Sequence, residues 1–107
     1  MSADTYIDVA DVSAVPPGAT VPFELSGRDI LICHTKEEFF AVANQCSHAR
    51  SKLEDGKLRA YRLICPLHGA AFDVRDGAVK GKPATLPLKT YPVRVVNNRI
   101  EVKLAQS

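Results

Sequence analysis

The sequence predicts an all-β fold, and three features of its residue pattern lead to that prediction. Val, Ile, Phe and Tyr gather in short segments, and residues typical of turns separate these segments. The one helical signal, Ser51 followed by Glu54 at capping-box spacing, precedes no apolar periodicity, so at most a single helical turn is expected there. The expected strands, in chain order, are Tyr6–Val9, Val21–Leu25, Asp29–His34, Glu38–Ala43, Leu58–Ile64, Ala71–Val74, Thr90–Val96 and Arg99–Leu104.

The links between these segments favour antiparallel pairing. Three of them contain Asn, Gly, Ser or Asp, which tolerate the positive φ angles of tight hairpins. They are Ser26–Gly27, Asp76–Gly77 and Asn97–Asn98. After the last link, residues 99–104 alternate between apolar and charged side chains, as in a strand with one buried face.

Size and composition limit the possible classes of protein. The 107 residues allow one domain, and 46% hydrophobic with 24% charged residues is an ordinary globular composition. The longest apolar runs, Ile30–Cys33 and Phe39–Ala43, are far shorter than the roughly 20 residues that span a bilayer. Lys and Arg exceed Asp and Glu by only 14 to 12 and are spread along the chain, which is not typical of nucleic-acid binding. Because the acidic N-terminus also lacks a secretory signal, we expect a cytoplasmic protein that binds neither membranes nor nucleic acids.

Two short segments each supply one cysteine and one histidine. They are Cys46 with His48 and, after sixteen intervening residues, Cys65 with His68. Thiolates and neutral imidazoles are ligands of iron–sulfur clusters and of zinc, and two of each complete a site. Each segment follows an expected strand, so both are expected in loops whose backbone can turn around a metal. The residues alone therefore predict a metal centre of either kind.

The remaining thiol and imidazole sit next to each other in an expected strand. Neighbouring side chains of a strand point to opposite faces, so Cys33 and His34 are not expected to share a metal. We expect Cys33 to be a small buried apolar residue and His34 to face solvent or a turn.

The two motifs resemble those of the Rieske family, whose loops read Cys-x-His and Cys-x-x-His at a similar separation. Further agreement lies in residues 69–73, in Gly77 and in the stretch from Pro83 to Tyr91, which resembles the family's third, proline-bearing loop over the cluster. The resemblance therefore covers roughly residues 44–95. It implies an antiparallel β-sandwich with a small cluster-binding subdomain built from two hairpin loops. It also implies one domain over residues 1–107, with its cluster-binding part at about 44–92, and one [2Fe–2S] cluster per chain.

The resemblance also implies which residue binds which iron. Cys46 and Cys65 would ligate the inner iron, and His48 and His68 the outer iron. High-potential family members carry a further cysteine in each loop, joined as a disulfide, and a serine and a tyrosine where this chain has Ala70 and Phe72. Their absence here implies a low reduction potential.

Within the family, the chain is similar to the ferredoxins of bacterial aromatic-ring dioxygenase systems. That similarity implies a monomeric one-electron carrier without catalytic residues. A flavin-dependent ferredoxin reductase would supply the electrons, and a terminal Rieske oxygenase would accept them. The chain would not itself be an oxygenase, because after the four ligands only His34 remains, whereas a mononuclear iron site needs two histidines and a carboxylate.

Two other functions stay open from the sequence. The chain could be a small Rieske-type subunit of a nitrite reductase or of another multisubunit oxidoreductase. The same four ligands could instead form a Cys2His2 zinc site in a structural module, although zinc modules usually have more closely spaced cysteine pairs. Visible colour of the purified protein separates a cluster from zinc.

Overall fold

The computed structural model describes residues 6–44, 53, 56–65, 70–81 and 87–104, and this part of the chain is all-β, as predicted. Its single 3-10 turn is η1 (Val12–Ala14). The strands are β1 (Tyr6–Asp11), β2 (Thr20–Leu25), β3 (Arg28–Thr35), β4 (Glu38–Ala43), β5 (Lys57–Arg59), β6 (Arg62–Ile64), β7 (Ala71–Asp73), β8 (Val79–Gly81), β9 (Thr90–Tyr91), β10 (Val93–Val96) and β11 (Arg99–Lys103). In these described ranges no helix is long and apolar enough to cross a membrane.

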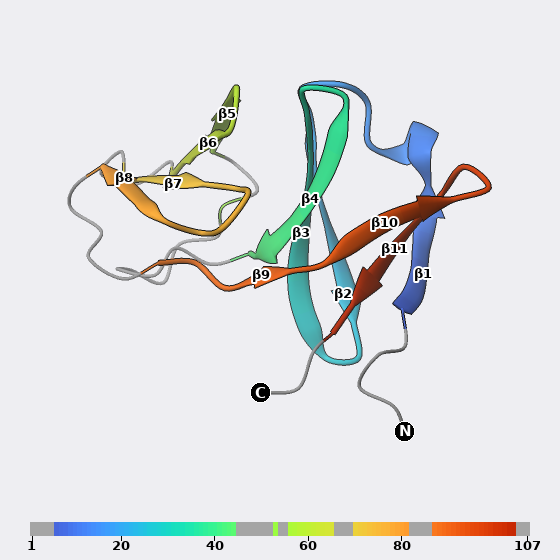
Figure 1. Ribbon diagram of the computed structural model, residues 1–107. Helices are drawn as coiled ribbons and strands as arrows, with labels where there is room; N and C mark the ends of the chain where they lie inside the picture. Colours follow the sequence, from blue (N-terminus) through green and yellow to red (C-terminus); the bar gives the residue numbers. More distant parts are fainter. Residues whose placement is uncertain (1–5, 45–52, 54–55, 66–69, 82–86, 105–107) are drawn as a thin grey trace.

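Antiparallel pairing arranges the strands in three sheets (Figure 1). Sheet A has the order β1-β11-β10, sheet B the order β2-β3-β4-β9, and sheet C the order β5-β6-β7-β8. One core cluster joins residues of sheets A and B, and a second joins residues of sheets B and C. Sheet B is therefore the middle layer, and sheet C is the small subdomain that the sequence predicted.

Strand β3 shows why sheet B has this place. Ile30 and Ile32 belong to the core shared with sheet A, whereas Leu31 and Cys33 belong to the core shared with sheet C. All four side chains are fully buried. A strand covered on both faces needs a continuous apolar run instead of alternation, and this explains the run Ile30–Cys33.

The predicted hairpin links are confirmed by their backbone angles. Ser26 and Gly27 have φ of 51° and 79° between β2 and β3, and Asn97 and Asn98 have φ of 52° and 64° between β10 and β11. Asp76 and Gly77 lie in the link between β7 and β8, where Gly77 has φ of 80°.

The prediction of a single strand over Leu58–Ile64 was wrong, because this segment is a hairpin of β5 and β6. Ala60 adopts φ of 53° at its turn. Leu58 pairs with Leu63, and both pack against the core shared by sheets B and C. Each short strand places one leucine against the core, Leu63 fully buried and Leu58 partly buried, and in sequence this run looks like one longer strand.

The expected strand Thr90–Val96 is also divided. Pro92, which has no N–H to donate, separates β9, paired with β4 in sheet B, from β10, paired with β11 in sheet A.

The sequence did not predict strand β8 or turn η1. Strand β8 has only one apolar residue, so it lacks the usual strand pattern. Turn η1 depends on a side-chain contact, in which Oδ2 of Asp11 accepts the Ser13 N–H at 2.9 Å. The predicted turn at residues 51–54 lies mostly outside the described residues.

Candidate metal centre

The second cysteine–histidine motif lies in the hairpin of β6 and β7. Cys65 directly follows β6, and its N–H donates to the carbonyl oxygen of Ala70 at 2.7 Å. The next pair in the ladder is Ile64 with Ala71. The two ends of the loop are thus fixed by backbone hydrogen bonds, while His68, between them in sequence, lies outside the described residues.

The Cys65 side chain is nearly inaccessible to solvent. Its exposed fraction is 1%, and it belongs to the core cluster of sheets B and C with Leu53, Leu63, Phe72 and Leu88. It forms no disulfide. A buried, unpaired thiol at a fixed loop end is suited to be a metal ligand.

The first motif follows β4, and Asn44 ties both ends of its segment together. The N–H of Asn44 donates to the carbonyl oxygen of Asp29 at 3.0 Å, while its side-chain Oδ1 accepts the N–H of Leu53 at 3.0 Å. Its Nδ2 also donates to the Asp29 carboxylate at 3.2 Å. Asn44 is 2% exposed. Residues 45–52, with Cys46 and His48, lie outside the described residues, but their flanking residues are held by this one buried amide.

Gly56 brings that segment against the second hairpin. Its N–H donates to the carbonyl oxygen of Leu53 at 2.9 Å, and a Cβ at this position would overlap the carbonyl oxygen of Ile64. Only glycine allows this close approach to the residue before Cys65. Leu53 and Cys65 share one core cluster, so the structure brings together the anchors of the two motifs.

A third segment, which the resemblance to the Rieske family places over the cluster, is anchored beside the two motifs. Residues 82–86 lie outside the described residues, but Leu88 is buried in the same cluster as Cys65. Its N–H donates to the carbonyl oxygen of Gly77 at 2.9 Å, and the N–H of Gly77 donates to the carbonyl oxygen of Asp73 at 2.7 Å. Gly77 therefore connects this segment to the end of β7.

We expect Asn44→Leu to destabilise the protein and to weaken its hold on the metal centre. The leucine leaves the buried N–H of Leu53 without its acceptor, which costs about 1–3 kcal/mol. For a chain of this size that is a fall in Tm of roughly 4–8 °C per kcal/mol, measurable by calorimetry. An Asn44→Leu protein with the stability and iron content of the wild type would show that this amide does not hold the segment.

Comparison with known protein families identifies the chain. The model of the Rieske [2Fe–2S] domain matches residues 5–92. The chain belongs to this family. This range includes all four residues of the two motifs as well as the anchors Asn44, Gly56 and Gly77.

Relatives and solved structures of Rieske proteins resemble the chain over nearly its full length. The ferredoxin component of a naphthalene 1,2-dioxygenase/salicylate 5-hydroxylase system from Ralstonia sp. is 34% identical over 99 residues, covering 92% of this chain and 95% of that protein. The ferredoxin of carbazole 1,9a-dioxygenase from Nocardioides aromaticivorans superposes with a TM-score of 0.89 at 33% identity, covering 97% of this chain and all of that one. A complex of reduced oxygenase and oxidized ferredoxin in carbazole 1,9a-dioxygenase contains a chain that is 26% identical with a TM-score of 0.89, covering 95% of both chains.

The cofactor that follows from the Rieske family is a [2Fe–2S] cluster, and the described part of the site fits it. Cys65 supplies a free thiol with apolar neighbours. Such surroundings disfavour net charge. They suit a cluster in which two thiolates cancel the charge of the oxidised core and the two imidazoles are neutral.

Besides Cys65, the described residues include one more thiol and one imidazole, both on β3. Cys33 is fully buried, and burial raises the pKa of its thiol to about 12, so it stays protonated near neutral pH. His34 is half-buried: its Nδ1 lies 2.7 Å from the carbonyl oxygen of Val15, and its ring stacks on Phe39 at 4.1 Å. The two residues pack on opposite sides of sheet B, as predicted, although His34 is less exposed than expected. The described residues contain no group of three or more possible ligands, and Cys46, His48 and His68 lie outside them.

The sequence did not predict the roles of Asn44 and Gly56, which hold the segments that flank the two motifs. Asn44 precedes the first motif by two positions and could have been noticed as a polar residue at the end of an apolar strand. Gly56 follows the capping-box segment, where a glycine indicates only the end of a helical turn. Its contact with Ile64 depends on the pairing of distant segments, for which the local sequence has no signal.

Proposed function

We propose that this chain is the ferredoxin component of an aromatic-ring dioxygenase system. In this role it takes single electrons from a flavin-dependent ferredoxin reductase and delivers them to a terminal Rieske oxygenase. The observation that carries the proposal is the 34% identity with a ferredoxin component over 92% of this chain and 95% of that relative. The ferredoxin–oxygenase complex of the carbazole system supports an oxygenase as the partner.

We further propose that Cys46, His48, Cys65 and His68 hold the cluster, with the cysteines on the inner iron and the histidines on the outer iron. The burial of Cys65 and the joined anchors of the two motifs support this assignment. When bound, the cluster supplies a reversible one-electron couple whose potential is raised by its two imidazole ligands.

The described residues around Cys65 would serve electron transfer in two ways. The apolar side chains of Leu53, Leu63 and Phe72 exclude water from the cysteine side of the site. The backbone hydrogen bonds at Cys65 and Leu88 keep the loop ends in place, so that little rearrangement accompanies a change of charge.

We also propose that all 107 residues form a single domain, whose cluster-binding part is about 44–92. We propose that this domain is monomeric and has no catalytic site of its own. The unpaired thiol of Cys33 is compatible with the cytoplasm as its compartment.

Reconstitution tests this function. With NADH, a flavin-containing ferredoxin reductase and a terminal oxygenase, product formation should require this protein and should saturate as its concentration rises. A protein that stays bound to one large oxidoreductase subunit through purification, and that no free reductase can reduce, would favour the subunit alternative. A colourless protein that contains zinc would exclude both electron-transfer functions.

We expect a reduction potential near the low end of the range of about −150 to +300 mV for Rieske centres. Ala70 and Phe72 are fully buried and donate no side-chain hydrogen bond, and donors to the cluster sulfurs stabilise the reduced state more than the oxidised one. At about 1 kcal/mol per hydrogen bond and about 59 mV per 1.4 kcal/mol, Ala70→Ser with Phe72→Tyr should raise the potential by roughly 50–120 mV.

A matched control separates this effect from added polarity in general. The strand period places Ala71 on the opposite face of β7 from Phe72, so Ala71→Ser should leave the potential unchanged. Protein-film voltammetry gives all three values. A wild-type potential well above zero, or a double variant with both hydroxyls seen at the cluster and no upward shift, would contradict the argument.

A further inference from the structure

Sheet C carries a strongly basic groove that the electron-transfer site does not use. The groove has a volume of about 280 Å³, and its charged and aromatic lining residues are Arg59, Tyr61, Arg62, Asp73, Arg75 and Lys80. Four cations and one carboxylate line it, whereas the whole chain has a formal net charge of only +2. The basic residues are dispersed in the sequence, and folding gathers four of them here.

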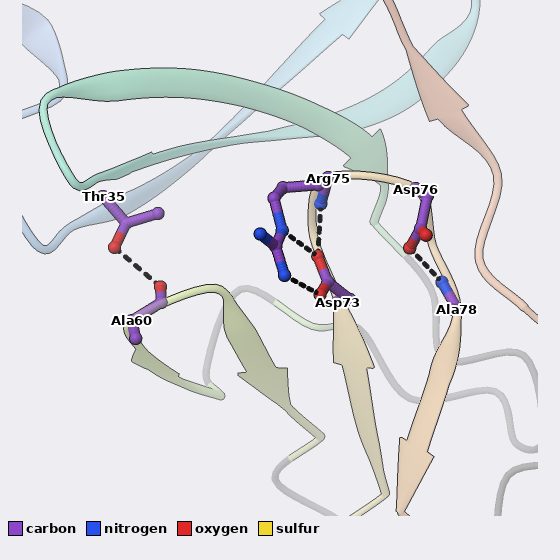
Figure 2. A network of polar contacts seen from close by, with 6 residues as sticks. All are labelled: Thr35, Ala60, Asp73, Arg75, Asp76 and Ala78. Atoms are coloured by element: carbon purple, nitrogen blue, oxygen red, sulfur yellow. Dashed lines mark hydrogen bonds and ion pairs between the residues drawn. The ribbon is translucent and has the colours of Figure 1, made fainter.

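The one carboxylate of this basic groove is already neutralised, as Figure 2 shows. Arg75 donates from Nε to Oδ1 of Asp73 at 3.0 Å and from Nη2 to Oδ2 at 2.7 Å, and its backbone N–H reaches Oδ1 at 2.8 Å. The Arg75 guanidinium also lies 4.0 Å from the centre of the Tyr61 ring. Among the carboxylates that the structure describes, none forms an ion pair with the exposed residues Arg59, Arg62 and Lys80.

The position of the two exposed arginines is unfavourable for the fold. Arg59 and Arg62 are directly opposite each other in the β5–β6 ladder, and like charges in such a pair destabilise a sheet. The turn between them is held by the Thr35 hydroxyl, which donates to the carbonyl oxygen of Ala60 at 2.6 Å (Figure 2). A like-charged pair on a rigid turn, with no compensating contact, is typical of a binding surface.

We propose that the basic groove docks an acidic surface of a redox partner protein, a proposal that rests on the function proposed above. The cations Arg59, Arg62 and Lys80 are exposed and lie on β5, β6 and β8, so each binds a small anion weakly in water. Together they attract and orient a large acidic surface, which mainly raises the association rate.

The groove and Cys65 lie at opposite ends of β6. Arg62 begins β6 and Cys65 directly follows it, so the two residues are about 10 Å apart along the strand. A partner surface that spans more than this distance can contact both the groove and the Cys65 end of β6.

Charge reversal at the groove provides the test. We expect Arg59→Glu with Lys80→Glu to lower kcat/KM for electron transfer with a reductase and oxygenase that accept the wild type, by about 10-fold at low salt and not at high salt. The control is Arg94→Glu with Arg99→Glu, which changes the charge equally on sheet A and removes two surface ion pairs and the contact of Arg94 with the Tyr6 ring. The control should stay within about twofold of the wild type. Equal rates for the groove variant and the wild type at low salt would overturn the proposal.

Two further measurements do not depend on the proposed function. A fluorescein-labelled octaglutamate peptide should bind the wild type and the sheet A control, but not the groove variant, by anisotropy at low salt. If inorganic phosphate or duplex DNA bound the groove as tightly as the peptide, an acidic protein surface would not be its ligand.

The second measurement is the Tm of Arg59→Glu alone. This variant should keep or raise Tm, because it places opposite charges across the ladder. A lower Tm would mean that the arginine pair stabilises the fold, and the argument from an unfavourable pair would fail. Absence of electron transfer by the wild type would refute the proposed function, while the peptide would still decide the role of the groove.

Discussion

Cys65→Ser should yield a protein that lacks the [2Fe–2S] cluster. The substitution removes a proposed ligand of the inner iron at the point where β6 enters its loop. A cluster ligand also holds its loop in the folded state, so loss of the metal lowers stability as well. We expect iron content and visible absorbance to fall to the background level, and His68→Ala to have a similar effect.

Cys33→Ser is the matched control for this prediction. Cys33 and Cys65 are about equally buried, at 0% and 1% exposed, and both lie in the core cluster of sheets B and C. A hydroxyl at Cys33 costs the fold about 1–3 kcal/mol, yet the cluster should remain. A bleached Cys33→Ser protein beside a coloured Cys65→Ser protein would show that the ligand assignment is wrong.

Gly77→Ala should destabilise the protein by several kcal/mol. Gly77 has φ of 80°, which costs an L residue about 1–2 kcal/mol. A Cβ at this position would also overlap the carbonyl oxygen of Leu88, and such overpacking typically adds 1–3 kcal/mol. Because Leu88 flanks the segment that the sequence places over the cluster, the variant should also lose cluster faster on storage in air.

Gly27→Ala separates the two contributions to this effect. Gly27 has φ of 79°, but a Cβ there meets no atom within 4 Å. It should therefore show only the conformational cost, and urea titration of both variants gives the difference. Equal free energies of unfolding for the two variants would mean that the added Cβ at position 77 does not clash with the Leu88 carbonyl oxygen.

The fold was predictable from sequence where side-chain alternation and turn residues agree. The strand Glu38–Ala43 has the predicted bounds, and the Asn97–Asn98 hairpin has the predicted positive φ angles. The two wrong strand predictions, Leu58–Ile64 and Thr90–Val96, come from segments in which the local residue pattern does not indicate the tertiary structure. The hairpin at Ala60 needs an alanine with positive φ, and Pro92 lets one apolar run serve two sheets.

For the site, the sequence predicts a set of ligands but not the surfaces around them. Residue type and spacing predicted Cys65 as a ligand, because the chemistry of a thiolate does not depend on the fold. Asn44 and Gly56 act through contacts with Leu53 and Ile64 that appear only after folding. The same is true of the basic groove, since its cations come from β5, β6, the link between β7 and β8, and β8.

An electron paramagnetic resonance spectrum of the dithionite-reduced protein tests the central claim most directly. Mixed ligation by two cysteines and two histidines gives a lower average g value than ligation by four cysteines. We predict this Rieske-type spectrum for the wild type, with an intensity of one spin per chain. The spectrum of an all-cysteine cluster, or no signal from fully reduced protein, would contradict the account.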